Sequence, residues 1–333
     1  MRGQPSLSGI TSAGGGLQDY AGCLYWYSHR NLTSNTDVLN AFAGISRILL
    51  ERTRIAMHTP ADSVFMIYGM PSNALDWALL WSPNLTAKRR PGGWPSWSWC
   101  GWVGGVASTY SFDWDELGDW IRDHTWIDWQ VFDTQGKVVD FRRKRSSEAS
   151  RTRFMSYDRG YDVTPTKMDV LAVEESCSAF TTSTRTLVHP EVVHAGKAIE
   201  LLPLLHFYSL MIKCRLEPVN DLRTSTANTD RLYSILGSRG PLGAIWVDAS
   251  WMCSHGIWYE FVLLSDAKLT QIKEEVRPQV KSETEWNAFN VMLVVPCGSD
   301  RRVAQRVAIG VVSAQALDPD EGLGADWSGL WLR

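Results

Sequence analysis

The chain has 333 residues, of which 44% are hydrophobic and 21% are charged, a composition typical of a folded globular protein and not of a disordered one. Its formal net charge is -3, which excludes the strong overall positive field that gathers nucleic acid or anionic membranes. A chain of this length can bury a large core without disulfides or metals. Tryptophan is unusually frequent, with 17 residues, and this favours a core built from large aromatic side chains.

Cysteine spacing and hydropathy narrow the class of protein further. The six cysteines are widely separated and form no CxxC pair, so we expect free thiols in a reducing compartment rather than a metal site or a disulfide scaffold. The first 20 residues lack the apolar core of a secretory signal. The longest apolar stretch, residues 201–212, is shorter than the about 20 residues of a membrane span. We therefore expect a cytoplasmic protein without a membrane span.

Two helices are predicted after a flexible Ser/Gly-rich lead-in at residues 1–20. Ser34 and Asp37 resemble a capping box at the start of a helix over residues 36–52. Apolar residues recur along that helix at intervals of three and four, and we expect them to be buried: Val38, Leu39, Phe42, Ile45, Ile48 and Leu49. A second helix is predicted at residues 72–82, capped by Ser72 or Asn73.

Residues 89–102 are the most distinctive part of the sequence. Trp97 and Trp99 alternate with Ser96, Ser98 and Cys100. A period of two predicts a strand with one aromatic face and one face of small residues. The two tryptophans could stack on a ligand, but we favour a core strand because burial of a large aromatic side chain is strongly stabilising.

Acidic and aromatic residues mix between residues 113 and 141, and two interpretations fit those at 113–133. Glycosidases place two carboxylates across a sugar that stacks on aromatic rings. A solvated acidic rim above an aromatic core has the same composition, and we prefer it. The carboxylates concerned are Asp113, Asp115, Glu116, Asp119 and Asp128. At the end of the region, residues 126–132 and 137–141 predict a hairpin around the turn residues 133–136.

The second half of the chain is predicted to be rich in strands. Residues 142–167 are basic and poor in apolar residues, and we interpret them as a mobile insertion or linker. The run from Arg142 to Arg145 could serve nuclear import, although a solvated loop is the preferred interpretation. The predicted strands are 168–173, 198–212, 243–248, 257–264, 286–295 and 303–312. A turn is predicted at residues 240–243 and a short helix around residues 266–277.

These elements predict an α+β fold. The N-terminal helices pack on a Trp-rich, mostly antiparallel sheet with a barrel-like core, which the C-terminal strands complete. The expected organisation is a lead-in at 1–20, helices and Trp-rich strands at 21–141, the basic linker at 142–167, and a β-rich part at 168–333 that belongs to the same core.

The histidines do not predict a metal site. His189 and His194 are five residues apart with a proline between them, whereas a metalloprotease helix needs two histidines at i and i+4. His206 lies in an apolar run and is expected to be a hydrogen-bonded core histidine. Neither a phosphate loop nor a dinucleotide-binding fingerprint is present, so no cofactor is expected.

Several blocks of the sequence resemble a known family. YSHRNLT at 27–33 and DVLNAFAGI at 37–45 resemble the "YS.R.LT…D.LNAF.GI" block of fungal heterokaryon incompatibility (HET) domain proteins. YGMP at 68–71 and DWALLW at 76–81 are similar to the family's "GLP…FD.ALLW" segment. RR at 89–90 and PSWSWCGW at 95–102 resemble its "RR…FPSWSWAGW". YEFVLLS at 259–265 and RVAIG at 306–310 are similar to its late strands.

The resemblance implies a role in non-self recognition and programmed cell death. In the family these blocks lie downstream of the HET domain, which is recognised by "LSYCWG"-like and "WIDALCIDQ"-like segments that this sequence lacks. The HET domain resembles the TIR fold, and some TIR domains cleave NAD. We therefore expect a non-catalytic recognition or regulatory region that binds another protein, either a further copy of itself or an incompatibility partner, with no catalytic residue, cofactor or metal of its own.

The resemblance assigns a structural role to its signature residues, which are Arg30, Asp37, Asn40, Phe42, Gly44, Trp81, Arg90, Pro95, Ser96, Trp97, Ser98, Trp99, Gly101, Trp102, Glu260 and Phe261. Two alternatives stay open. One is a carbohydrate-active hydrolase that uses carboxylates of residues 113–133 beside tryptophans. The other is a nonfunctional remnant of a longer gene.

Overall fold

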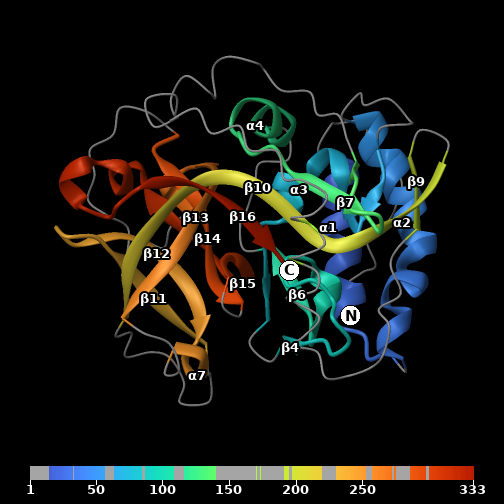
Figure 1. The fold of residues 1–333 in the computed structure, drawn as a ribbon, viewed down its shortest axis with the longest axis horizontal. Helices are drawn as coiled ribbons and strands as arrows, with labels where there is room; N and C mark the ends of the chain where they lie inside the picture. The colour runs from blue at the N-terminus through green and yellow to red at the C-terminus, as the bar shows by residue number, and fades with distance from the viewer. Residues whose placement is uncertain are drawn as a thin grey trace.

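A computed structural model describes residues 15–32, 34–56, 64–84, 87–108, 116–139, 191–194, 197–219, 230–252, 257–271, 286–297 and 300–333, together with residues 170, 173 and 274. The N-terminal helices lie on one side of the molecule and a large sheet of mostly antiparallel strands on the other (Figure 1). The predicted α+β fold class is therefore confirmed. The predicted basic linker at 142–167 lies outside the described residues.

The described part begins with helix α1 (Gly15–Ser28), which was not predicted from the sequence. Leu17, Tyr20 and Leu24 lie on one face of this helix and are buried. The predicted lead-in is thus wrong from residue 15 onward. Its three consecutive glycines obscured an apolar period of three and four residues that begins directly after them.

The predicted helix at 36–52 is confirmed and extends further. A short 3₁₀ turn, η1 (Asn35–Asp37), leads into α2 (Val38–Ala56). The hydroxyl of Ser34 accepts a hydrogen bond from the backbone N–H of Thr36 at 3.3 Å, which satisfies one of the free donors at the start of the helix. Of the predicted buried stripe, Val38, Phe42 and Leu49 are fully buried. Ile48 is 59% exposed instead, because α2 covers the core with its other face.

Short elements follow α2. They are β1 (Met66–Ile67), β2 (Met70–Pro71), η3 (Ser72–Ala74), α3 (Leu75–Ala78), β3 (Trp81–Pro83), β4 (Lys88–Arg89), η4 (Trp99–Gly101), β5 (Trp102–Val103) and β6 (Val106–Ser108). The predicted helix at 72–82 was too long, because the chain leaves the helix after Ala78 and Trp81 begins a strand. Ser72 does not cap the helix; its hydroxyl accepts a hydrogen bond from the N–H of Phe65 at 3.1 Å.

The strand predicted through Trp97 and Trp99 is wrong. The chain makes a turn and the 3₁₀ helix η4 there, started by Ser98, whose hydroxyl accepts from the N–H of Cys100 at 3.2 Å. Both tryptophans are nevertheless buried, with exposed fractions of 0% and 1%. The small residues between them are buried too, so the alternation reflects burial on all sides and not the two faces of a strand.

The rest of the chain supplies most of the sheet. Its elements are α4 (Leu117–Asp123), β7 (Gln130–Asp133), β8 (Val138–Val139), β9 (Glu191–His194), β10 (Lys197–Pro218), β11 (Asp230–Leu236), β12 (Pro241–Asp248), α7 (Ala249–Met252), β13 (Trp258–Ala267), η6 (Leu269–Gln271), β14 (Ala288–Cys297), β15 (Asp300–Ser313), η8 (Ala314–Leu317), η9 (Pro319–Glu321) and β16 (Asp326–Leu332). The β7–β8 hairpin and five of the six predicted strands are confirmed.

Three predictions in this half need correction. The described residues of the sixth strand, Val170 and Val173, are helical. The predicted turn at 240–243 lies earlier, because Gly237 donates to the carbonyl of Gly240 at 2.9 Å and Pro241 already begins β12. In the described part of the predicted helix at 266–277, β13 continues to Ala267 and η6 follows.

Six strands close into an antiparallel ring, in the order β10, β11, β12, β15, β14, β13 and back to β10. Closure of a sheet removes its exposed edges, and it makes the core barrel-like, as predicted. Gly243 and Gly310 lie where β12 meets β15, and a Cβ at Gly243 would overlap the carbonyl of Val311.

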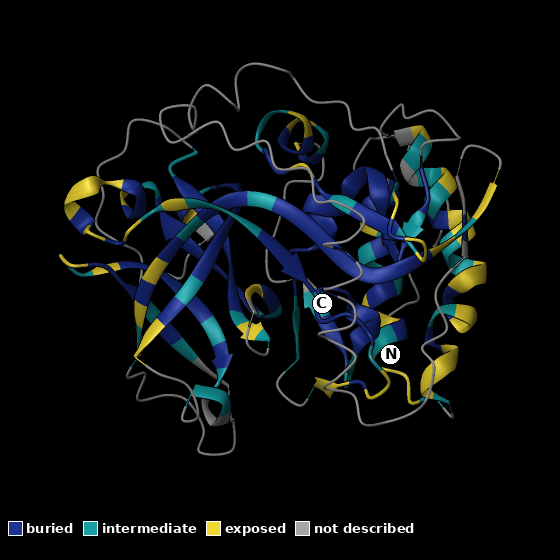
Figure 2. Cartoon of the chain, in the orientation of Figure 1, coloured by how far each residue is buried: buried dark blue, intermediate teal, exposed yellow. Residues whose placement is uncertain are grey.

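β10 connects the barrel to the helical side. Along its length it pairs in turn with β9, β7, β16, β13 and β11, and it crosses the width of the molecule (Figure 1). The middle of this strand is buried, whereas α2 presents exposed residues at the outer edge of the molecule (Figure 2). The hydroxyl of Tyr68 donates to the carbonyl of Leu201 in β10 at 2.8 Å, which ties the segment after α2 to the sheet.

Candidate functional site

Residues 94–102, hereafter the tryptophan segment, lie between the helices and the barrel. The ring of Trp99 packs edge-on against Phe42 of α2, with centroids 5.0 Å apart, and against Tyr27 of α1 at 5.7 Å. The indole of Trp97 packs edge-on against Tyr68 at 5.6 Å and donates to the carbonyl of Pro203 in β10 at 3.4 Å. The segment therefore joins α1 and α2 to the sheet.

Arg89 holds both ends of the tryptophan segment. Its guanidinium donates to the carbonyl of Trp94 at 2.6 Å and to that of Gly101 at 2.7 Å. The same group lies over the ring of Trp102, 5.2 Å from its centroid. The planar fork of an arginine can bind several carbonyls at once, so one side chain closes the segment into a loop.

Arg90 holds the segment from the other side. It donates to the carbonyls of Cys100 at 2.7 Å and Trp102 at 3.0 Å, and to the side-chain oxygen of Asn35 at 2.8 Å. Arg90 is buried, and this burial lowers the pKa of its guanidinium, because loss of water disfavours the charged form. The contact with Asn35 links the segment to the turn before α2.

Ser96 and Arg306 connect the segment to β15. The hydroxyl of Ser96 donates to the carbonyl of Arg333 and accepts from the backbone N–H of Arg306 at 3.0 Å. The guanidinium of Arg306 donates to the carbonyls of Leu79 at 2.8 Å and Trp81. These bonds join positions more than 200 residues apart in the sequence, so they fix the N-terminal part against the end of the chain.

The signature residues separate into three groups. Those of the tryptophan segment, with Arg90, Trp81 and Phe42, lie at the contacts described above, and all but the half-buried Trp102 are buried. Arg30, Asp37, Asn40 and Gly44 are exposed around the start of α2. Glu260 and Phe261 lie in β13, where Phe261 is fully buried and Glu260 is 3.6 Å from Lys213.

Two bracing residues were not recognised in the sequence as site residues. Arg89 stands beside a signature arginine, and Arg306 stands in an apolar run of β15. A charged residue inside an apolar strand that is buried on both faces indicates an internal partner, and this signal could have identified Arg306. Its partners are distant in the sequence and could not have been named from it.

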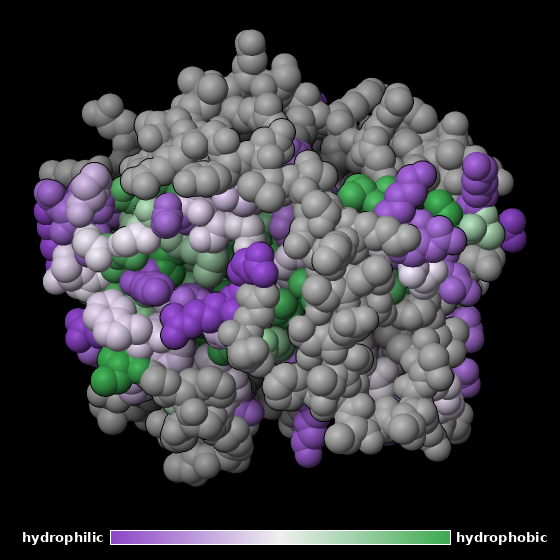
Figure 3. Space-filling model, in the orientation of Figure 1, coloured by the Kyte–Doolittle hydropathy of each residue, from purple (hydrophilic) through white to green (hydrophobic). Residues whose placement is uncertain are grey.

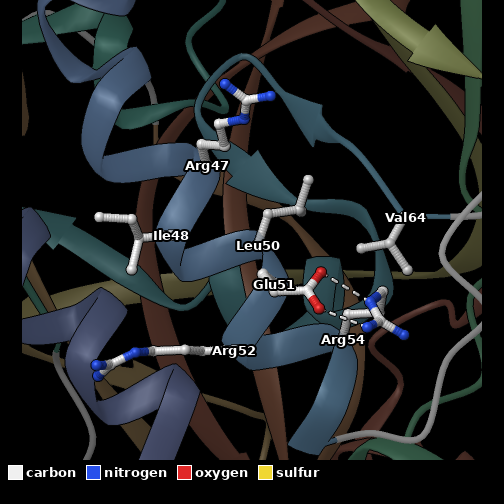
Figure 4. A pocket seen from close by; sticks show the side chains of 7 residues that line it. All are labelled: Arg47, Ile48, Leu50, Glu51, Arg52, Arg54 and Val64. Atoms are coloured by element: carbon white, nitrogen blue, oxygen red, sulfur yellow. Dashed lines mark hydrogen bonds and ion pairs between the residues drawn. The ribbon is translucent and has the colours of Figure 1, made fainter.

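A surface pocket of about 570 Å³ lies on α2 and is lined by Arg47, Ile48, Leu50, Glu51, Arg52, Arg54 and Val64. Glu51 faces Arg54, while Ile48 and Arg52 project away from this ion pair (Figure 4). Hydrogen bonds from Arg54, one of 2.9 Å, lower the pKa of the Glu51 carboxyl. Arg52 forms an ion pair with Asp19 of α1.

Arg47 differs from the other two arginines of the pocket. It is exposed and makes no ion pair with any residue that the structure describes. The pocket therefore offers a positive charge without an ion pair among the described residues, beside the exposed side chain of Ile48 and the half-buried Leu50. Chemically it can bind an acidic and apolar surface of another molecule, and we take it as the candidate binding site.

The carboxylates of the glycosidase interpretation can be placed only in part. Asp113 and Asp115 lie outside the described residues. Glu116 accepts from Lys268 at 2.8 Å, Asp119 accepts from Arg122 at 2.6 Å, and Asp128 is exposed. On the face shown in Figure 3, hydrophobic and hydrophilic side chains are interspersed over the strand-rich side.

The last of the candidate residues from the sequence are the histidines and cysteines. His206 is buried and its Nδ1 lies 2.9 Å from the side-chain oxygen of Gln130, as predicted. Cys23, Cys100, Cys214 and Cys297 are free cysteines, and Cys177 and Cys253 lie outside the described residues. In the part of the chain that the structure describes, no three His, Cys, Asp or Glu side chains are grouped as a metal site.

Comparisons with protein-family models, with curated proteins and with solved structures found no match. None of the described helices is long and apolar enough to cross a bilayer.

Proposed function

We propose that this chain is a non-catalytic recognition or regulatory region that acts by binding another protein. The process would be the one implied by its resemblance to HET-domain proteins, namely fungal heterokaryon incompatibility with programmed cell death of fused cells. Its place of action would be the cytoplasm. Any effector chemistry would belong to a HET domain that acts with it.

One observation carries this proposal. Four of the exposed large hydrophobic side chains among the described residues lie on α1 and α2, namely Tyr25, Trp26, Ile48 and Ile55. The other two are Ile257, directly before β13, and Trp258, its first residue. Trp26 is 63% exposed. Exposed apolar groups gathered on one surface are typical of protein-binding sites, and aromatic residues are enriched at the centres of such sites.

The buried tryptophan segment supports the same proposal, because it makes the surface of α1 and α2 rigid. Ser96, Arg89, Arg90 and Arg306 direct their polar groups at backbone carbonyls of the chain itself. Such bonds hold α1 and α2 at a fixed place on the barrel. A surface that is held rigidly loses less conformational entropy when a partner binds, so the scaffold favours recognition by α1 and α2.

The test is a cell-fusion assay in a filamentous fungus that carries a HET-domain incompatibility system. One strain of the pair expresses the chain, and dead fusion cells are counted with a vital dye. We expect wild-type chain to change the death frequency and Trp26→Ser to weaken that change. A death frequency equal to that of the empty vector, with soluble folded chain present, would contradict the proposal.

A second assay separates recognition from the hydrolase alternative. Purified chain is incubated with a panel of polysaccharides, and released reducing ends are measured. We expect no release above that of the matched variants Glu116→Gln and Asp128→Asn. Release that these variants abolish would replace recognition with glycoside hydrolysis.

A further inference from the structure

The outer face of α2 carries a regular line of exposed residues. Ala41, Gly44, Ile48, Glu51 and Ile55 follow one another at intervals of three or four residues and are all exposed. In a helix this spacing places side chains in one row. We call this row the α2 stripe. It is small at its N-terminal end and large at its C-terminal end, and a Cβ at Gly44 would meet only open space.

We propose that the α2 stripe binds the same stripe of a second copy of this chain, as an antiparallel pair with a two-fold axis at Ile48. A two-fold axis makes residues at equal distances on either side of Ile48 face each other. Ile55 of one copy then faces Ala41 of the other, and each bulky side chain fills the space above a small one. Parallel pairing would instead set the two large ends against each other.

Charge complementarity supports the same arrangement. Seen along the helix, Arg47 and Glu51 lie about 100° and 60° from Ile48 in the same sense, so both are on one flank of the stripe. A two-fold axis perpendicular to antiparallel helices keeps each flank on its own side. With a rise of about 1.5 Å per residue, Arg47 of one copy lies only about 3 Å along the axis from Glu51 of the other.

Two symmetric ion pairs therefore flank the Ile48 contact. Arg47 is available for them because it makes no ion pair with the residues that the structure describes. Both oxygens of Glu51 already accept from Arg54, but each carboxylate oxygen has a second lone pair and can accept from another arginine. The two-fold axis of a parallel pair would run along the helices and put the charged flanks of the two copies on opposite sides, so Arg47 of one copy would not meet Glu51 of the other.

The proposed interface is small, so we expect a weak dimer. A single helix face buries less than the about 800 Å² per partner of a standard interface. A dissociation constant on the order of 10–100 µM is consistent with this size and with the exposed position of the ion pairs.

The experiment is sedimentation equilibrium of the purified full chain at loading concentrations from about 1 to 500 µM, a range that brackets the dissociation constant expected for so small an interface. We expect a concentration-dependent dimer. Ile48→Arg places two like charges at the two-fold axis and should abolish it. Ile257→Arg, at a still more exposed position directly before β13, should leave it unchanged. A wild-type chain that stays monomeric throughout, or a dimer that Ile48→Arg leaves intact, overturns the proposal.

A charge exchange tests the antiparallel geometry itself. Arg47→Glu and Glu51→Arg each create two like-charge contacts and should each weaken the dimer about tenfold. The double variant restores opposite charges and should return the affinity to within about threefold of wild type. Both residues are exposed, and circular dichroism verifies that the variants fold. Additive weakening in the double variant would contradict the pairing.

This inference deepens the proposed function by naming a second copy as one partner of α2, and it rests on that function only for its biological meaning. Sedimentation uses the pure chain, whereas the fusion assay uses the cell. A dimer without an effect on cell death would leave the inference standing and contradict the function. A monomer that still changes cell death would contradict the inference and leave the proposed function standing.

Discussion

The guanidinium of Arg306 lies over the ring of Trp81 inside the core, with its Cζ 3.8 Å from the ring centroid. A cation over an aromatic face is attracted by the negative centre of the ring, and more strongly when water is excluded. Through the same side chain, β15 reaches the carbonyls of Leu79 and Trp81. This contact joins the barrel to the segment that carries the tryptophans.

Arg306→Met is expected to destabilise the chain by about 3–5 kcal/mol, because it keeps most of the apolar volume but leaves two buried carbonyls without their donor. The measurement is the free energy of unfolding in urea. Arg301→Met is the matched control, because Arg301 lies in the same strand and is exposed. Its effect should stay within about 0.5 kcal/mol. Equal effects of the two variants would contradict the bracing role of Arg306.

Gly101→Ala is expected to destabilise the chain by about 2 kcal/mol or more, because a Cβ there would overlap the carbonyl oxygen of Pro95 and the guanidinium of Arg89. Gly22→Ala is the control: Gly22 lies in α1 with open space around the added Cβ. Alanine there should stabilise by about 0.5–1 kcal/mol, because it favours the helix. Thermal unfolding of both variants shows whether each substitution lowers or raises the stability of the chain. A stabilised Gly101→Ala would refute the close packing of the tryptophan segment.

The stability of the chain is expected to fall above pH 9. Burial raises the pKa of the Cys100 and Cys214 thiols to about 12, from an ordinary value of 9.0. Between these values the unfolded chain has released the thiol protons while the folded chain keeps them. Stability is thus complete below pH 9 and is lost as pH rises toward 12, by up to about 1.4 kcal/mol per pH unit for each thiol.

Urea unfolding at pH 8, 9 and 10 measures this loss. The variant with both Cys100→Ala and Cys214→Ala should show a shallower decline between pH 9 and 10 than the wild type, although it is less stable at pH 8 because it lacks two buried side chains. An identical slope in the two proteins would show that these thiols are not the cause.

Most of the barrel could be predicted from the sequence. Long apolar runs such as residues 257–264 and 286–295 are bounded by polar or turn-forming residues, and only strands buried on both faces tolerate such runs. β9, β11 and β16 were not predicted. β16 contains polar and small residues such as Ser328 and Gly329, which weakened its pattern although it pairs with the middle of β10.

The arrangement of the tryptophan segment could not be predicted from its local pattern. Alternation of Trp97, Ser98 and Trp99 suits a strand, but the hydroxyl of Ser98 donates to the carbonyl of Tyr68 at 2.7 Å and accepts from Cys100. These bonds depend on a chain segment 30 residues away. Tertiary contacts thus override the local preference. The candidate site on α2 was missed because periodicity alone placed Ile48 in the core.

The central claim is that buried indoles brace a rigid scaffold, and the most direct test compares the unfolding free energies of Trp97→Ala and Trp258→Ala. Trp97 is fully buried and Trp258 is 61% exposed. We predict a loss of about 3–5 kcal/mol for Trp97→Ala and less than about 1 kcal/mol for Trp258→Ala. A loss below about 1 kcal/mol for Trp97→Ala would contradict the account.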